Sequence, residues 1–147
     1  MSTDLPRLIG INHVALEVGD IDEALAFYGK IFSFTLRGRG KGQAFIDMGD
    51  QFLALMQTPT PHQDRGRHFG LVVDDRARVR ALAEAAGAKM VGGPFLDFFD
   101  PWGNRIEIVA YSDVQFSKAP NVLRGMEFAG DKNADAKQQL AKKNMAT

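Results

Sequence analysis

The stretch HVALEVGD at residues 13–20 returns 55 positions later as HFGLVVDD at residues 68–75. The two copies align His13 with His68, and a strand-like apolar run follows each histidine. An aspartate closes each copy at the point where a helix is expected to begin. A repeat of this kind predicts two copies of one structural unit within the chain.

The second half of each copy repeats with an offset of 53 residues. FIDMGDQFLALM at residues 45–56 lies over FFDPWGNRIEIV at residues 98–109. This alignment matches Ala54 with Glu107 on the last strand of each copy. The change from 55 to 53 residues is what one shorter loop after the helix would produce.

Between the matched strands, apolar side chains recur at helical spacing over residues 21–32 and 76–88. Each copy therefore has the pattern βαβββ, and the polar segment TPTPHQDRGR at 58–67 links the two. We predict an α+β fold in which two βαβββ modules, at residues 9–57 and 66–111, form a curved mixed-sheet cleft. A C-terminal extension completes the single domain at residues 1–128, and residues 129–147 are expected to form a flexible or weakly helical tail.

Composition narrows the functional classes. The chain has 147 residues, of which 45% are hydrophobic and 24% charged, as in an ordinary globular protein. The 18 basic and 18 acidic residues leave a net charge of +0, which argues against a nucleic-acid-binding protein. The absence of cysteine excludes disulfides and thiolate chemistry. With no membrane-length apolar run and no secretory signal pattern, the expected location is the cytoplasm.

Two histidines and a glutamate are candidate metal ligands. Because side chains alternate along a strand, His13 and His68 fall on the faces opposite the covering helices. Glu107 lies between Ile106 and Ile108, where a carboxylate is costly unless it is paired or bound to a metal. Each residue taken singly is more often structural. Together, two imidazoles and a carboxylate suit one divalent cation with positions left open for water or substrate.

Other side chains are candidates for contact with a substrate. Phe45, Met56 and Phe98 lie on or near the open face, where they would suit an apolar ligand, or equally in the core. Tyr111 follows the last strand and either contacts substrate or packs the tail. Glu17 shares the face of His13 and is a candidate general base, but no catalytic residue is assigned.

Several motifs resemble the vicinal oxygen chelate superfamily of glyoxalases, bleomycin resistance proteins and ring-cleaving dioxygenases. The first helix carries the family pattern D-x6-F-Y, and the end of the second module carries D-P-x-G-x3-E: Asp20, Phe27 and Tyr28, then Asp100, Pro101, Gly103 and Glu107. The resemblance covers about residues 9–111. It implies one divalent metal per site (Fe, Mn, Zn or Ni), held by His13, His68 and Glu107, and chelation of a small substrate through neighbouring oxygens.

The chain departs from individual members of that superfamily. Ala54 stands where glyoxalase I has a glutamate ligand, which disfavours isomerase chemistry. The ligand set is similar to that of fosfomycin thiol transferases and ring-cleaving dioxygenases. However, Ala15 and Phe116 replace the threonine and the phosphonate-binding arginine of the fosfomycin enzymes.

The resemblance therefore implies a metal-dependent dioxygenase, lyase or transferase. The alternative is a metal-independent protein that binds a bleomycin-type antibiotic. Relatives of this size are commonly homodimers with shared metal sites, which would combine His13 of one chain with His68 and Glu107 of the other.

Overall fold

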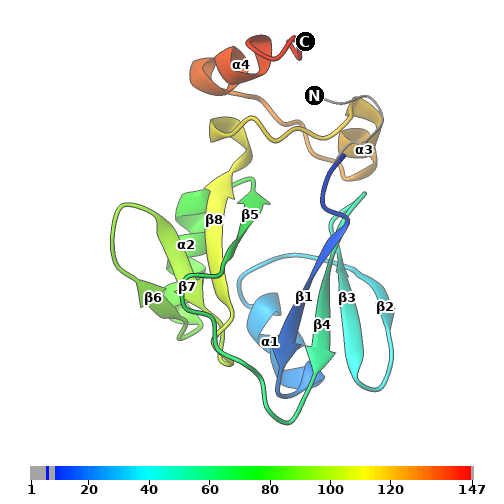
Figure 1. Ribbon diagram of the computed structural model, residues 1–147, viewed down its shortest axis with the longest axis vertical. Coiled ribbons are helices and arrows are strands. Elements are labelled where there is room, and N and C mark those ends of the chain that lie inside the picture. The colour runs from blue at the N-terminus through cyan, green and yellow to red at the C-terminus, as the bar shows by residue number, and fades with distance from the viewer. Residues whose placement is uncertain (1–5, 7–8, 147) are drawn as a thin grey trace.

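Two four-stranded sheets with their helices make up most of the chain (Figure 1). The computed structural model describes residue 6 and residues 9–146. The first module contains β1 (His13–Val18), α1 (Ile21–Gly29), β2 (Leu36–Arg39), β3 (Gln43–Asp47) and β4 (Phe52–Gln57). The second contains β5 (Phe69–Val73), α2 (Arg76–Ala85), β6 (Lys89–Val91), β7 (Leu96–Phe99) and β8 (Arg105–Ala110). The 3-10 turn η1 (Tyr111–Asp113), α3 (Pro120–Gly125) and α4 (Ala134–Ala141) follow.

Both sheets have the same topology. Their strand orders are β1-β4-β3-β2 and β5-β8-β7-β6. In each sheet the first strand runs parallel to the last strand of its module, and the other neighbours are antiparallel. The predicted α+β fold of two βαβββ modules is confirmed. None of the helices in the described residues is long and apolar enough to cross a membrane.

The strand registers reproduce the sequence repeat. Ala15 on β1 lies opposite Ala54 on β4, and Gly70 on β5 lies opposite Glu107 on β8. The offsets of 55 and 53 residues therefore both hold between the parallel strands of the two sheets. Each helix also begins in the same way, because an aspartate just before it accepts a hydrogen bond from a backbone amide of its first turn.

The repeat slips by one residue in the strands β3 and β7. Phe45 is the cross-strand partner of Ala54, but the partner of Glu107 is Asp97. The match of Phe45 with Phe98 is therefore wrong. The turn before β8 holds five residues and the turn before β4 holds four, which shifts β7 relative to β3. As a result Phe98 points into the core, where it is 0% exposed, and Asp97 takes its place on the open face.

The two modules pack together through α1, which Figure 1 shows between the sheets. The Tyr28 hydroxyl donates to Oδ2 of Asp100 at 2.7 Å, and both side chains are buried. The ring of Phe27 lies 6.5 Å from that of Phe98. One hydrophobic core therefore contains buried side chains from both modules. Each sheet turns its helix-covered face toward this core and its open face outward.

Asp100 also fixes the turn that receives α1. Its Oδ1 accepts hydrogen bonds from the backbone amides of Trp102 and Asn104, both at 2.9 Å. Its Oδ2 accepts a further bond from the Asn104 side-chain amide at 2.8 Å. The same amide donates to the backbone carbonyl of Glu17 at 2.8 Å, which adds a second bond between the modules. The aspartate and the tyrosine of the two family motifs are thus structural here.

Two lysines hold the C-terminal extension. Lys118 Nζ donates to the carbonyl of Met48 at 2.8 Å and pairs with Asp50, which ties the extension to the first module. The stretch expected to be flexible or weakly helical contains α4. Lys132 Nζ donates to three backbone carbonyl oxygens that follow β8, those of Tyr111, Val114 and Phe116.

The variant Tyr28→Phe tests the junction between the modules. It removes one donor from a buried carboxylate and keeps the ring, so we expect the free energy of unfolding to fall by about 1–3 kcal/mol. Urea denaturation at neutral pH measures this change. Tyr111→Phe is the matched control, because among the described residues its hydroxyl makes one hydrogen bond, which it accepts from the Lys118 amide at 3.3 Å. Equal losses in the two variants would contradict the assignment.

The same junction predicts a dependence on alkaline pH. Burial, followed by the neighbouring Asp100 carboxylate, raises the pKa of Tyr28 well above its usual 10.0. The unfolded chain ionises first as the pH rises, so stability that is present below about pH 10 is lost above it. Raising the pH from about 9.5 to 11 should therefore lower the melting temperature of the wild type more than that of Tyr28→Phe, and thermal denaturation measures both. Parallel curves would show that Tyr28 does not carry the effect.

Candidate metal centre

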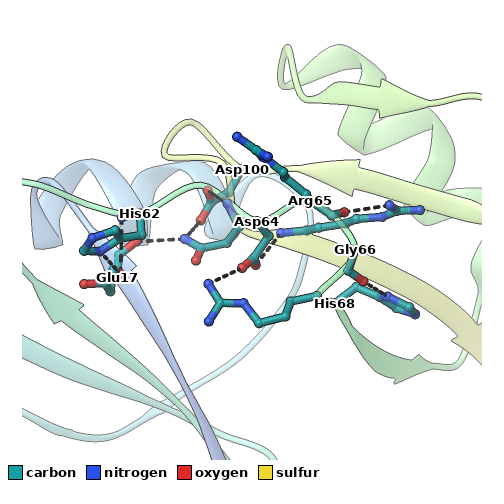
Figure 2. Close-up of polar contacts among 10 residues, drawn as sticks. Glu17, His62, Asp64, Arg65, Gly66, His68 and Asp100 are labelled. Atoms are coloured by element: carbon teal, nitrogen blue, oxygen red, sulfur yellow. Dashed lines mark hydrogen bonds and ion pairs between the residues drawn. The ribbon is translucent and has the colours of Figure 1, made fainter.

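His68 is oriented by a backbone carbonyl. It lies directly before β5, and its Nδ1 is 2.9 Å from the carbonyl oxygen of Gly66 (Figure 2). A carbonyl only accepts, so Nδ1 carries the hydrogen and Nε2 of the neutral ring keeps a free electron pair. A backbone carbonyl in this position is typical of metal-binding histidines, because it fixes both tautomer and ring orientation.

Glu107 meets that free nitrogen from the neighbouring strand. Its Oε2 lies 3.8 Å from Nε2 of His68, too far for a hydrogen bond. Two ligand atoms each about 2.1 Å from one ion are at most about 4.2 Å apart, so this spacing allows a shared metal. Gly70 lies beside Glu107 on β5, and the space above its Cα is open. The open face is therefore accessible at the point where the two ligands converge.

His13 is held in the same way on the other sheet. Its Nδ1 lies 2.8 Å from the side-chain oxygen of Asn12, so Nε2 is again the free nitrogen. Its ring stacks on Phe52 with centroids 4.7 Å apart and an interplanar angle of 9°. The guanidinium of Arg37 lies 4.3 Å from the centroid of the same Phe52 ring. Neighbouring aromatic and cationic side chains thus limit the positions of the His13 ring.

One chain does not bring His13 to the other two candidate ligands. His13 opens β1 and His68 precedes β5, and these strands run in opposite directions in Figure 1. Within the described part of the chain, no three histidine, aspartate or glutamate side chains lie close enough to hold one metal ion. The chain pairs His68 with Glu107 and leaves His13 on the open face of the first module.

The proposed substrate contacts lie in different places. Phe45 is half-buried on the open face of the first sheet, with its ring edge-on to Phe52 at 5.7 Å. Met56 is 39% exposed and lies opposite Glu17 on the neighbouring strand. Tyr111 is 6% exposed, and its ring packs against two phenylalanines of the C-terminal extension. A role of these three residues in substrate binding stays a prediction.

Glu17 is poorly suited to act as a general base. Its Oε1 accepts hydrogen bonds from the backbone amide of His62 at 3.2 Å and from the His62 ring at 3.0 Å (Figure 2). These bonds, led by the one from the backbone amide, lower the pKa of Glu17 below its ordinary value. The remaining histidine of the chain therefore ties the linker to β1.

Two residues on the open faces escaped the sequence reasoning. Phe52 supports His13, and the alternation that placed Ala54 on the open face also places Phe52 there. Asp97 was missed because the sequence alignment of the repeat matched Phe98 with Phe45, whereas in the structure Asp97 occupies the position equivalent to Phe45. Its side chain is 6% exposed and accepts a 2.9 Å hydrogen bond from Nε of Arg105.

Two βαβββ modules of the same topology, each with a histidine at the start of its first strand or directly before it, and a glutamate on the final strand define the class to which the chain belongs. The chain belongs to the Glyoxalase/Bleomycin resistance protein/Dioxygenase superfamily, whose model matches residues 10–108. It is similar to glutathione transferase FosA of Serratia marcescens, with 26% identity over 69% of this chain and 80% of the relative.

Solved structures show the same fold. The fosfomycin resistance protein FosX of Listeria monocytogenes matches with a TM-score of 0.60 and 17% identity, over 71% of this chain and 94% of its own. A mutant of that protein, complexed with Mn(II) and 1S,2S-dihydroxypropylphosphonic acid, matches with a TM-score of 0.60 and 18% identity. This match covers 69% of this chain and 90% of FosX.

Proposed function

We propose that the protein is a metal-dependent enzyme that binds a small oxygen-rich substrate through two neighbouring oxygens. His13, His68 and Glu107 are the proposed ligands of one divalent cation, either Mn, Fe, Zn or Ni. The reaction belongs to the dioxygenase, lyase or thiol-transferase types of the superfamily.

The observation that carries this proposal is the matched orientation of the two histidines. Both rings have Nδ1 against an oxygen acceptor and Nε2 free, although different partners hold them. The Glu107 carboxylate lies at the free nitrogen of His68 and is half-buried. A structural histidine does not require this arrangement, whereas metal ligands do.

The residues present fit a divalent cation. Two neutral imidazoles and one carboxylate offer three donors and one negative charge, which leaves positions for substrate oxygens. When bound, the cation would act as a Lewis acid toward those oxygens. Ala54 supplies no second carboxylate opposite Glu107, so we favour addition or transfer over the proton abstraction of glyoxalase I.

Two relatives support a metal-dependent role. FosA is named a glutathione transferase, and one FosX structure holds Mn(II) with a dihydroxypropylphosphonate. Ala15 and Phe116 depart from the phosphonate-binding pattern of that group. We therefore propose metal chemistry like that of these relatives, with a substrate other than fosfomycin.

A complete site requires a second copy of the chain. The Tyr28–Asp100 junction turns both open faces outward, so His13 of one copy can meet only the His68–Glu107 pair of another. A two-fold axis would place the first sheet of each chain against the second sheet of its partner and form two equivalent sites. We propose such a homodimer, in which the open faces cover one another.

An alternative function is metal-independent binding of a bleomycin-type antibiotic. A cavity of about 780 Å³ favours it, because its size suits a drug-sized ligand. This cavity lies between the inner faces of the modules and is closed in part by the C-terminal extension. His13 and His68 border it, but ligand binding there would not need their free nitrogens.

Metal binding by single variants tests the ligand set. We expect His13→Ala and Glu107→Ala each to weaken Mn²⁺ binding at least about 100-fold, since even partners behind a ligand contribute 10–100-fold. His62→Ala is the matched control and should bind as the wild type does. Isothermal titration of metal-free protein gives the affinities. Undiminished binding in either ligand variant, or no binding in the wild type, would contradict the metal site.

Mixing variants tests the shared site. A heterodimer of a His13→Ala chain and a Glu107→Ala chain has one intact site and one site that lacks both ligands. Random exchange should therefore restore Mn²⁺ binding to about a quarter of all sites, although each variant alone binds none. Exchange is verified by native mass spectrometry. A monomer in light scattering, or no recovery after verified exchange, would rule out the shared site.

A further inference from the structure

Asp97 places a second carboxylate beside the candidate metal centre. It is the cross-strand partner of Glu107, so both side chains rise from the same face of the second sheet. Opposed residues in such a pair have Cβ atoms about 4.5–5.5 Å apart. Asp97 does not complete a cluster of three possible metal ligands with Glu107 and His68 in the described residues. It therefore lies next to the metal centre, not within it.

The two oxygens of Asp97 differ. Oδ2 accepts the hydrogen bond from Nε of Arg105, whose Nη1 donates to the backbone carbonyl of Arg65 at 2.9 Å. Oδ1 is buried and has no hydrogen-bond partner among the described residues. A buried carboxylate oxygen without a donor is unfavourable, so the fold retains an acceptor that something else must satisfy.

We propose that Asp97 forms a donor subsite, which means a subsite that receives a hydrogen-bond donor of the substrate. Oδ1 accepts the hydrogen bond, and an ammonium or hydroxyl group of the substrate donates it. This inference rests on the proposed metal site, where the cation held by His13, His68 and Glu107 would bind the vicinal oxygens of the same molecule. Asp97 is 5% exposed and Oδ1 is buried, so only a small donor group can reach this oxygen.

The charge of the subsite selects against anions. An acidic group in the position of the donor would bring a negative charge against the Asp97 carboxylate. The ion pair with Arg105 offsets part of this charge, but its Nε and Nη1 are already used by Asp97 and by the carbonyl of Arg65 and cannot bind the anion. Ala15 and Phe116 remove further partners that a phosphonate would need. The preferred substrate therefore has a cationic or neutral donor next to its chelating oxygens.

Three hydroxamic acids of matched length test the subsite on Mn²⁺-loaded protein. All chelate through two neighbouring oxygens, and they differ at the far end: β-alanine hydroxamic acid carries an ammonium, butyrohydroxamic acid a methyl, and succinic monohydroxamic acid a carboxylate. We expect the ammonium compound to bind about tenfold more tightly than the methyl compound, because a charge-assisted hydrogen bond forms. The carboxylate compound should bind most weakly.

The variant Asp97→Asn sharpens the test. Nε of Arg105 must still face an oxygen, so the amide nitrogen takes the place of Oδ1 and the subsite becomes a donor. The preference should then shift toward succinic monohydroxamic acid. Asp131→Asn removes the same charge from an exposed position in the C-terminal tail and should keep the wild-type order.

The outcomes separate the two proposals. If Mn²⁺ binds and the three hydroxamates have equal affinity in the wild type, a buried water satisfies Oδ1 and the donor subsite is wrong. Tightest binding of the carboxylate compound by the wild type would also overturn it. If the protein binds neither Mn²⁺ nor any hydroxamate, the metal site itself is wrong and the subsite fails with it. The order of the three hydroxamate affinities in the wild type decides whether the subsite exists, even if Asp97→Asn does not fold.

Discussion

The buried carboxylate of Asp100 determines how the two modules face each other. It accepts hydrogen bonds from three donors of its own turn and from the hydroxyl of Tyr28 on the other module. A buried charge is stable only when its acceptor sites are filled, so α1 cannot leave this turn without a large cost. The helix-covered faces of both sheets consequently share one core. The open faces, with all candidate ligands, are directed away from it.

This constraint divides the residues of the family motifs by role. Asp20, Tyr28 and Asp100 cap a helix, join the modules and fix a turn. The candidate ligands lie on strands or directly beside them, where the pleat alone decides which face they occupy. The parallel ladder of β5 and β8 holds Glu107 opposite Gly70, and it begins at Phe69, directly after His68. The structural motifs therefore act on the chemistry only through the orientation of the sheets.

The sequence repeat predicted the modules and the faces of the candidate ligands because both depend on short-range periodicity. Strand alternation places Glu107 on the open face whatever surrounds it, and the registers agree. Asp97 could not be placed in this way, because one extra residue in a turn reverses the face of every residue in the strand before it. The outward orientation of the sheets was equally hidden, since it depends on a hydrogen bond between residues 72 positions apart in sequence.

The two open faces differ in chemistry, and this difference bears on how a shared site would work. The first sheet offers the aromatic side chains of Phe45 and Phe52 around His13. The second offers the carboxylates of Glu107 and Asp97. In the proposed homodimer they would form a cleft with one wall of aromatic side chains and one wall that carries carboxylates, and the proposed metal ligands would come from both. A substrate in this cleft would have its chelating oxygens at the metal, its polar donor toward the second sheet and its apolar part toward the first. Neither face could impose that orientation alone, so selectivity would depend on the same assembly that completes the proposed metal site.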